Sequence, residues 1–541
     1  MGKKRLIWLA GLLMVLVLLL PMGTNHALQE NAQPITSFTP TVDPVLSIDP
    51  IQDAQASSDP LAVTRRGLFV SCDFFITQVD TWPSSNNNIK TVADTLSGGS
   101  MSFDKMVFMP GNLYSVAGLE HEIQSAFGDA DENDVSYFYI STHGTYDAAQ
   151  PNLDAGLYLS NGVSEEIMTA RQLQDAFAGI KGTKVLIIDA CNSGAFIGKG
   201  LSGGAGEAAF LGPDYKVLTS AGGSEESWYW SSAGKETQGV QGASYFASAL
   251  SDALGYHGEY GADLNGDGEI TLSESYRYLL ENHSASMTQS YPQEDDFVLF
   301  TYDVNSLYKN PSPEESIITG VTFYDTVLDN MQNTVSFEFT VEKPVQVAYQ
   351  IVYYKDGKWQ FSAAPLKYDD KEIVGDFGDQ KGFLSPGRKQ RTLELAPQGN
   401  DTYGYAMIQL VTLEENKTTV HASRVLCVPP ASGDPELSVK TDAALDLKNS
   451  RELSILINHK YPCLLSVSII DANGKTVRRL SSYQPTRPQH LTPTGSFFYW
   501  GGKLADGSLA APGEYTVKVT AYIGDVPYEA VSASFALLGV E

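Results

Sequence analysis

The order of apolar and polar residues divides the chain into an α/β part and a strand-rich part. Five continuous apolar runs occur in the first part, and each has the length of one strand: GLFVSCDFF, KMVFMP, VSYFYIST, KVLIIDA and YKVLTSA. Unbroken runs of this kind are typical of parallel strands that are covered on both faces. The intervening segments IKTVADTLS, LEHEIQSAF and TARQLQDAFAGI have apolar residues at helical spacing. This alternation predicts a doubly wound, mostly parallel α/β sheet over residues 64–305.

Beyond the PSPEE turn, the pattern changes to short alternating strands such as VSFEFTV and VQVAYQIVYY. Asp356-Gly357 before KWQF is a hairpin signal, and Asn473-Gly474 within LLSVSIIDANGKTVRRL is a second one. A Pro/Gly/Asp break, PPASGDP, separates the two strand sets. We therefore expect one β-sandwich over 315–430 and another over 435–541.

The N-terminus has the composition of an export signal. Three basic residues precede an apolar run from Leu6 to Leu20, which is shorter than the ~20 residues of a membrane-spanning helix. We expect a signal peptide over 1–27 and a protein that is secreted or held in the cell envelope, with an uncleaved membrane anchor as the alternative. Residues 28–63 are rich in Pro, Thr, Ser and Gln, which favours a flexible linker or a pro-segment.

Charge and cysteine content narrow the class of partner. The formal net charge is −28, an acidic balance that repels phosphate backbones and anionic lipid surfaces, so nucleic acid is not expected as a partner. Four cysteines are too few for a disulfide scaffold in a chain of 541 residues. Cys72 lies in an apolar run and is expected to be a buried thiol. Cys427 and Cys463 are candidates for a disulfide, although the sequence does not fix their pairing.

Two strand ends carry reactive side chains. VSYFYIST ends at His143-Gly144, and KVLIIDA leads to Cys191 within DACNSG, 48 residues after His143. In doubly wound sheets the ligand lies beyond the carboxyl ends of the strands, and a strand-helix-strand crossover can bring these two ends together. An imidazole beside a thiol activates it as a nucleophile, and the N–H groups of Gly144 and Cys191 are candidates for an oxyanion hole.

The segments SYFYISTHGTYD and VLIIDACNSGAF resemble the caspase-like cysteine peptidases, a group that includes metacaspases, legumains, clostripain and gingipains. The resemblance covers roughly residues 64–305. It is closest to the metacaspase-like bacterial members, because caspases proper read Gln-Ala-Cys at the nucleophile. It implies a caspase-like fold and a cysteine endopeptidase acting on proteins or peptides, with His143 and Cys191 as the catalytic residues.

Two further implications come from resemblance. In metacaspase-like members the Asp two places before the nucleophile lines a pocket for basic P1 side chains; here it is Asp189, which implies cleavage after Arg or Lys. A carboxylate that only caps the next turn is the alternative. The segment WGGKLADGSLAAPGEYTVKVTA resembles the Ig-like repeat of flagellar hook-capping proteins and many secreted bacterial enzymes, which implies an Ig-like accessory module. Protein, glycan and cell wall are the candidate ligands of the two sandwiches.

Two other functions remain open from the sequence. The α/β domain can be an inactive scaffold in a binding or adhesion protein, since the sandwiches make up nearly half of the chain. The same thiol can also support transpeptidation, if an amine attacks the acyl-enzyme in place of water.

The segment DLNGDGEITLSE fits a calcium-binding EF-hand loop between two helical stretches. An EF-hand loop uses oxygen ligands at positions 1, 3, 5, 7 and 12, and a turn glycine at position 6. Here the glycine is Gly268. The five ligand positions are Asp263, Asn265, Asp267, Glu269 through its carbonyl, and Glu274. The sequence therefore predicts a structural Ca²⁺ site, with a solvated acidic turn as the alternative.

Two loops complete the sequence predictions. Arg65-Arg66 precedes the first apolar run and is a candidate site of self-processing, with solvation of the domain edge as the alternative. Glu225 and Glu226 follow the fifth apolar run, in a loop that is expected either to line the substrate pocket or to pack at the surface.

Overall fold

The structure is a computed structural model, and it describes most of the chain from residue 63 onward. The described ranges are 63–77, 85–111, 113–147, 155–201, 208–231, 242–256, 259–282, 285–305, 317–324, 327–328, 334–360, 366–368, 382–394, 403–414, 417–449, 452–488 and 495–539. The predicted signal peptide, and the predicted linker up to residue 62, lie outside them. Within these ranges, no helix combines the length and the apolar character that crossing a membrane requires.

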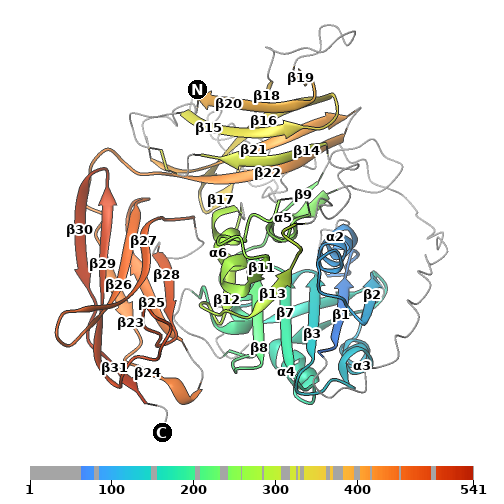
Figure 1. The fold of residues 1–541 in the computed structure, drawn as a ribbon, viewed down its shortest axis with the longest axis horizontal. Helices are drawn as coiled ribbons and strands as arrows, with labels where there is room; N and C mark the ends of the chain where they lie inside the picture. Colours follow the sequence, from blue (N-terminus) through green and yellow to red (C-terminus); the bar gives the residue numbers. More distant parts are fainter. Residues whose placement is uncertain are drawn as a thin grey trace, which may run out of the picture.

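A six-stranded sheet forms the centre of the α/β domain, in the order β12-β8-β7-β3-β1-β2 (Figure 1). Its strands are β1 (Arg65–Ser71), β2 (Lys105–Pro110), β3 (Val135–Ser141), β7 (Thr183–Asp189), β8 (Tyr215–Thr219) and β12 (Gln289–Tyr291). The first five strands are parallel, and β12 is antiparallel to β8. The predicted mixed α/β architecture with a parallel sheet is therefore confirmed.

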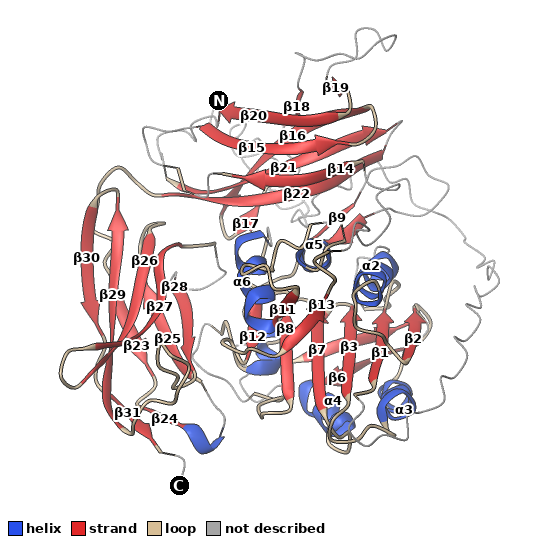
Figure 2. Ribbon diagram, in the orientation of Figure 1, coloured by secondary structure: helices blue, strands red, loops and turns tan. Residues whose placement is uncertain are grey.

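Helices cover both faces of this sheet (Figure 2). They are α2 (Ser85–Ser97), α3 (Val116–Phe127), α4 (Ala170–Phe177), α5 (Tyr245–Ala253) and α6 (Leu272–Asn282). Because successive strand residues point to opposite faces, Leu68 and Val70 pack with α3 and α4, whereas Phe69 packs with α2, α5 and α6. This two-sided burial explains why the strands read as unbroken apolar runs.

Short elements extend from the carboxyl ends of the strands and from the domain edge. They are β4 (Gly144–Thr145), β5 (Gly156–Ser160), β6 (Glu165–Thr169), the 3₁₀ helix η1 (Ser193–Ile197), β9 (Tyr229–Ser231), β10 (Gly242–Ser244), β11 (Glu269–Thr271) and β13 (Val298–Thr301). Three small sheets result, β4-β5-β6, β9-β10 and β11-β13.

Residues 318–428 form two antiparallel sheets that share one core. One sheet contains β14 (Ile318–Phe323), β15 (Thr334–Val341) and β20 (Gly387–Glu394). The other contains β16 (Val345–Lys355), β17 (Lys358–Trp359), β18 (Leu366–Tyr368), β19 (Phe383–Leu384), β21 (Gly404–Glu414) and β22 (Lys417–Val428). Alternate residues of β15, including Phe337, pack against β16 and β21 between the sheets. The hairpin predicted at Asp356-Gly357 is confirmed, since both residues have positive φ.

Residues 438–538 form a second pair of packed sheets. One sheet contains β23 (Ser438–Thr441), β25 (Leu453–Asn458) and β28 (Gly495–Trp500). The other contains β24 (Ala444–Asp446), β26 (Leu464–Asp471), β27 (Thr476–Pro485), β29 (Gly513–Ile523), β30 (Val526–Val531) and β31 (Phe535–Leu538), and the short 3₁₀ helix η5 (Leu447–Asn449) follows β24. Trp500 is fully buried between the sheets. Below, residues 318–428 are called the middle sandwich and residues 438–538 the C-terminal sandwich.

The dibasic pair does not form the accessible boundary that the sequence suggested. Strand β1 begins at Arg65, and Arg66 is only 8% exposed. Its guanidinium pairs with Asp134 at 2.7 Å and with Asp129 at 3.2 Å. A peptidase needs an extended, accessible segment, so a paired residue inside a sheet strand is a poor site for cleavage.

Candidate active site

The parallel register of β3 and β7 brings the two predicted catalytic residues together. Ser141 at the end of β3 lies opposite Asp189 at the end of β7, and the N–H of Thr142 donates to the Asp189 carbonyl at 3.2 Å. His143 and Cys191 each follow two residues after these strand ends, and Gly144, the residue after His143, lies against the Cys191 carbonyl. Both side chains are therefore at the carboxyl edge of the sheet, where the crossover through α4 was expected to place them.

The Cys191 thiol lies against the backbone of Ser227. Its Sγ accepts from the Ser227 N–H at 3.4 Å, and the thiol donates to the Ser227 carbonyl at 3.7 Å. Burial raises the pKa of Cys191 to about 12, and the negative charges of Glu226 and Asp189 add to this rise. The thiol is therefore neutral at rest, and a base must accept its proton when it reacts.

His143 is held through its backbone carbonyl and through one ring contact. Its carbonyl accepts from the Tyr158 N–H of β5 at 3.0 Å. The imidazole contacts the ring of Phe75 edge-on, with 4.5 Å between ring centroids and an interplanar angle of 65°. The residue is half-buried, and these two contacts restrict the direction of its ring.

Gly144 fits a space that no side chain could share. A Cβ on this residue would lie 1.9 Å from the carbonyl oxygen of Cys191. Gly144 lies opposite Leu157 in the β4-β5 ladder. The hydrogen bond from the Tyr158 N–H to the His143 carbonyl belongs to the neighbouring pair, so Gly144 and Leu157 form a non-hydrogen-bonded pair. The N–H of Gly144 consequently points away from β5, as a donor to a substrate carbonyl requires.

The loop after β8, residues 221–227, wraps the turn that carries the nucleophile. Asn192 has a left-handed φ of 58°; its N–H donates to the Glu225 carbonyl at 2.7 Å and its side-chain amide to the Gly223 carbonyl at 3.0 Å. The Gly194 N–H donates to the Ala221 carbonyl at 2.9 Å. Asn192 is thus a turn residue.

Asp189 lies beside the nucleophile, but its side chain has no exposed surface. The Tyr139 hydroxyl donates to one carboxyl oxygen at 3.0 Å, and the Ser227 hydroxyl lies 3.4 Å from the other. Burial raises the pKa of Asp189 to about 6, and these hydrogen bonds oppose the rise. A substrate side chain can reach this carboxylate only if some of the groups that cover it, Ser227 among them, move aside.

Two residues of the loop after β8 gain importance only from the structure. Ser227 contacts both Cys191 and Asp189, and no sequence signal marked it, because serine is common in loops. Glu225 is only 6% exposed; its carboxylate accepts from the N–H groups of Gly222 at 3.0 Å and Met287 at 2.9 Å. Burial raises the pKa of Glu225 to about 7. Glu225 therefore holds the loop from a buried position.

The aromatic residues that follow this loop contact the middle sandwich. Trp228 and Trp230 are half-buried and pack with Tyr245 and with a group of middle-sandwich residues: Val352, Trp359, Tyr405, Met407, Val425 and Cys427.

Cys427 and Cys463 are both buried free thiols, so the candidate disulfide is not formed in this structure. The thiol of Cys427 lies 3.8 Å from the carbonyl oxygen of Cys463.

The predicted calcium loop has the expected donor types, but they do not converge. The Asp263 carboxylate accepts from the N–H groups of Gly266 at 2.7 Å and Gly268 at 3.0 Å, and from the Tyr302 hydroxyl at 2.8 Å. Glu274 accepts from the Thr271 N–H at 2.9 Å, at the start of α6. Throughout the described ranges, no group of three or more His, Cys, Asp or Glu side chains is placed to hold a metal ion.

The other predicted ligands of this loop bond to one another. The Asn265 amide donates to Asp267 at 2.9 Å, and Asp267 accepts from the Glu269 N–H at 2.8 Å. Ile270, at position 8 of the loop, pairs with Phe300 of β13, where a second EF-hand would pair. Calcium binding at this loop stays a prediction.

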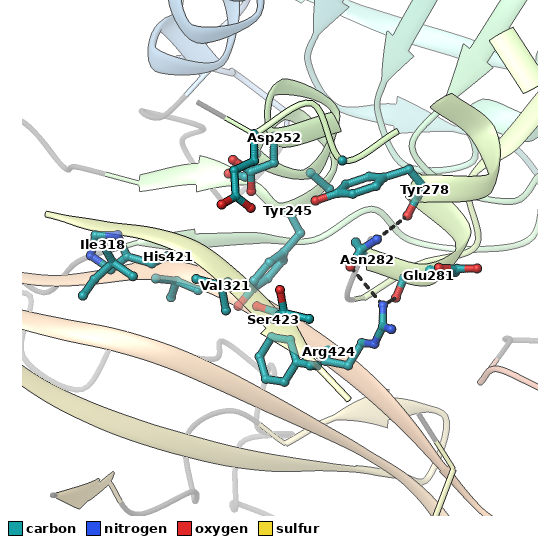
Figure 3. A pocket seen from close by; sticks show the side chains of 18 of the residues that line it. Tyr245, Asp252, Tyr278, Glu281, Asn282, Ile318, Val321, His421, Ser423 and Arg424 are labelled. Carbon is teal, nitrogen blue, oxygen red and sulfur yellow. Dashed lines mark hydrogen bonds between the residues drawn. The ribbon is translucent and has the colours of Figure 1, made fainter. Parts of the chain in front are cut away.

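A pocket of about 270 Å³ lies between the α/β domain and the middle sandwich (Figure 3). Its walls come from α5 and α6 on one side and from β14 and β22 on the other, and neither His143 nor Cys191 lines it. The Arg424 guanidinium at its edge donates to the Glu281 carbonyl at 2.7 Å and to Asn282 at 2.9 Å. This pocket is a feature of domain docking and lies apart from the candidate catalytic pair.

Comparisons with known proteins give matches among solved structures only. Neither the protein-family models nor the curated proteins include a match to this chain. Among solved structures, the chain is similar to caspase-1 from Spodoptera frugiperda, with 18% sequence identity and a TM-score of 0.27. The alignment covers 45% of this chain and 91% of the caspase chain.

Proposed function

We propose that this protein is a cysteine endopeptidase in which Cys191 is the nucleophile and His143 the general base. The observation that carries the proposal is the parallel register of β3 and β7, because His143 and Cys191 each follow two residues after the adjacent ends of these strands. Gly144 supports it, because this position admits no side chain against the Cys191 carbonyl and turns its N–H away from β5.

The groups at this edge can carry out acyl transfer in two steps. His143 accepts the Cys191 proton as the sulfur attacks the substrate carbonyl carbon, and the N–H groups of Gly144 and Cys191 donate to the resulting oxyanion. His143 then protonates the leaving amine, which breaks the peptide bond and leaves a thioester. Water attacks the thioester, His143 takes the water's proton, and the Cys191 thiol is released with the carboxylic acid product.

We also propose that Asp189 selects Arg or Lys at P1. Its carboxylate is next to the nucleophile, and a charge-assisted bond to a guanidinium would favour basic side chains. Such a bond would replace the contact that Ser227 makes with Asp189. Substitution of Asp189 by Ala should then remove the preference for Arg or Lys and leave cleavage after neutral residues.

Substitution of the pair tests the proposed activity. Cys191→Ala and His143→Ala should each abolish turnover of fluorogenic peptides and leave the melting temperature nearly unchanged, because both residues act at the chemical step. Matched controls are Cys72→Ala, at a buried thiol bonded to the Leu113 carbonyl, and His121→Ala, at an exposed position on α3. Substantial turnover by either test variant would refute the pair, and product analysis with an added amine would separate hydrolysis from transpeptidation.

Export, calcium and the sandwiches belong to the same proposal. We propose that the protein acts outside the cytoplasm after removal of residues 1–27, and that the loop from Asp263 to Glu274 holds a structural Ca²⁺ ion. The C-terminal sandwich is proposed to be Ig-like, and either sandwich could bind protein, glycan or cell wall. If no peptide is cleaved, a binding protein on an inactive scaffold becomes the better reading.

A further inference from the structure

Lys199 connects the nucleophile region to the C-terminal sandwich through a buried ion pair. Its ammonium pairs with Glu452, and the two side chains are only 4% and 7% exposed. The same ammonium donates to the Ser290 carbonyl at 2.6 Å and lies 4.3 Å from the centroid of the Tyr499 ring. The hydroxyl of Tyr499 accepts from the N–H of Gly200 at 2.8 Å.

The backbone of Lys199 and Gly200 joins the two loops that surround Cys191. The Lys199 N–H donates to the Gly194 carbonyl at 2.9 Å, in the turn after the nucleophile. The Lys199 carbonyl accepts from Gly223 at 2.8 Å and the Gly200 carbonyl from Ser224 at 2.9 Å. These two acceptors hold the loop whose Ser227 contacts the Cys191 thiol. Gly200 is required here, because its φ is +66° and a Cβ would lie 2.6 Å from the Cα of Gly222.

We propose that the C-terminal sandwich helps to build the active site. Its Glu452 and Tyr499 are positioning residues that hold Lys199-Gly200. Through these two residues they hold the Cys191 turn and the Ser227 loop. This inference rests on the proposed peptidase function. It assigns the sandwich a role in the reaction itself, beyond any ligand that its outer surface binds.

Loss of Glu452 should disturb the position of Lys199 because the ion pair between them is buried. Burial lowers the pKa of Lys199, and the negative charge of Glu452 opposes this change, so the ammonium depends on its partner. Loss of one member leaves an unpaired buried charge, whereas loss of both charges together is far better tolerated. A Lys199 ammonium without Glu452 would turn toward water and pull the backbone bonds to Gly194 and Gly223 with it.

A second ion pair at the same domain boundary provides a matched control. Arg478 of the C-terminal sandwich pairs with Glu294, which follows β12, and these side chains are 23% and 27% exposed. The Arg478 guanidinium donates hydrogen bonds to Glu294 and to the Leu504 carbonyl, and neither residue belongs to the loops around Cys191. Arg478→Gln therefore weakens domain docking and removes none of the bonds made by Lys199, Gly200, Glu452 or Tyr499.

The experiment compares full-length Glu452→Gln, Arg478→Gln and the double variant Lys199→Met/Glu452→Gln with the unmodified protein. We would measure kcat and KM on a fluorogenic peptide, the melting temperature, and the rate at which iodoacetamide alkylates Cys191, read by mass spectrometry. Glu452→Gln should lower kcat roughly tenfold or more, with KM within about threefold, because a small shift of the nucleophile is costly. The rate at which iodoacetamide alkylates Cys191 should also change in Glu452→Gln. Arg478→Gln should keep the kcat and the alkylation rate of the unmodified protein. The double variant should recover most of kcat.

Opposite outcomes overturn the inference. The network would be refuted if Glu452→Gln folded and had the kcat and alkylation rate of the unmodified protein. It would also be refuted if Arg478→Gln lost as much kcat as Glu452→Gln. If Glu452→Gln does not fold, Tyr499→Phe removes only the acceptor for the Gly200 N–H and should show a smaller change of the same kind. The alkylation rate needs no substrate, so it tests the network even if the proposed peptidase activity fails.

Discussion

A single methyl group at Gly144 tests the closest approach in the candidate active site. The Cβ of Gly144→Ala would lie 1.9 Å from the carbonyl oxygen of Cys191 and 3.1 Å from the Cβ of Ala190. Real Cβ atoms almost never come within 3.0 Å of such an atom, so the two backbone segments must separate by about 1.1 Å. The contact is with backbone on both sides, and no flexible side chain can give way.

This displacement predicts both a kinetic and a thermodynamic effect. A misplacement of about 1 Å at a reacting group costs on the order of 100-fold in rate, so kcat/KM should fall by roughly that factor. Overpacking a tight site costs about 1–3 kcal/mol, so the free energy of unfolding should also decrease. Both effects arise although His143 and Cys191 remain in place.

The assay measures kcat/KM on a fluorogenic peptide with Arg at P1, together with the melting temperature. Gly179→Ala is the matched control, because a Cβ on Gly179 would meet no atom within 4 Å and φ there is not positive. This control should keep the activity and stability of the unmodified protein. If Gly144→Ala retained kcat/KM within threefold and an unchanged melting temperature, the argument from close approach would be wrong.

Three further predictions concern Asp189, the loop from Asp263 to Glu274, and Arg66. Burial raises the pKa of Asp189 from 3.8 to about 6, so between these pH values the folded state keeps a proton that the unfolded state releases. The free energy of unfolding should therefore decrease by about 3 kcal/mol as the pH rises from about 4 through 6. Chemical denaturation of Asp189→Asn should show a smaller decrease over the same pH range. Ca²⁺ should raise the melting temperature of the protein but not of Glu274→Gln, and equal shifts in both would place any bound calcium elsewhere. Since Arg66 is buried and paired, N-terminal sequencing should find no cleavage after Arg65 or Arg66, whether Cys191 is intact or replaced by Ala.

The sequence by itself determined the features that depend on neighbouring residues. Unbroken apolar runs identified the buried parallel strands, because a strand covered on both faces has no polar side. Asp356-Gly357 identified a hairpin, because few other residue pairs accept positive φ at both positions. The positions of His143 and Cys191 at strand ends were enough to suggest that they meet, since the carboxyl ends of parallel strands share one edge.

Only the tertiary structure decided which distant groups complete that edge. Ser227 lies 36 residues from Cys191 and reaches its thiol through the fold of a loop with no sequence signature. Asp189 was recognised as a carboxylate near the nucleophile, but its complete burial and its bonds to Tyr139 and Ser227 come from the fold. The Lys199–Glu452 pair joins two domains, and local patterns carry no information on which surfaces dock. Apolar periodicity records whether a residue is buried, whereas the partner of a buried charge is set by packing across the whole chain.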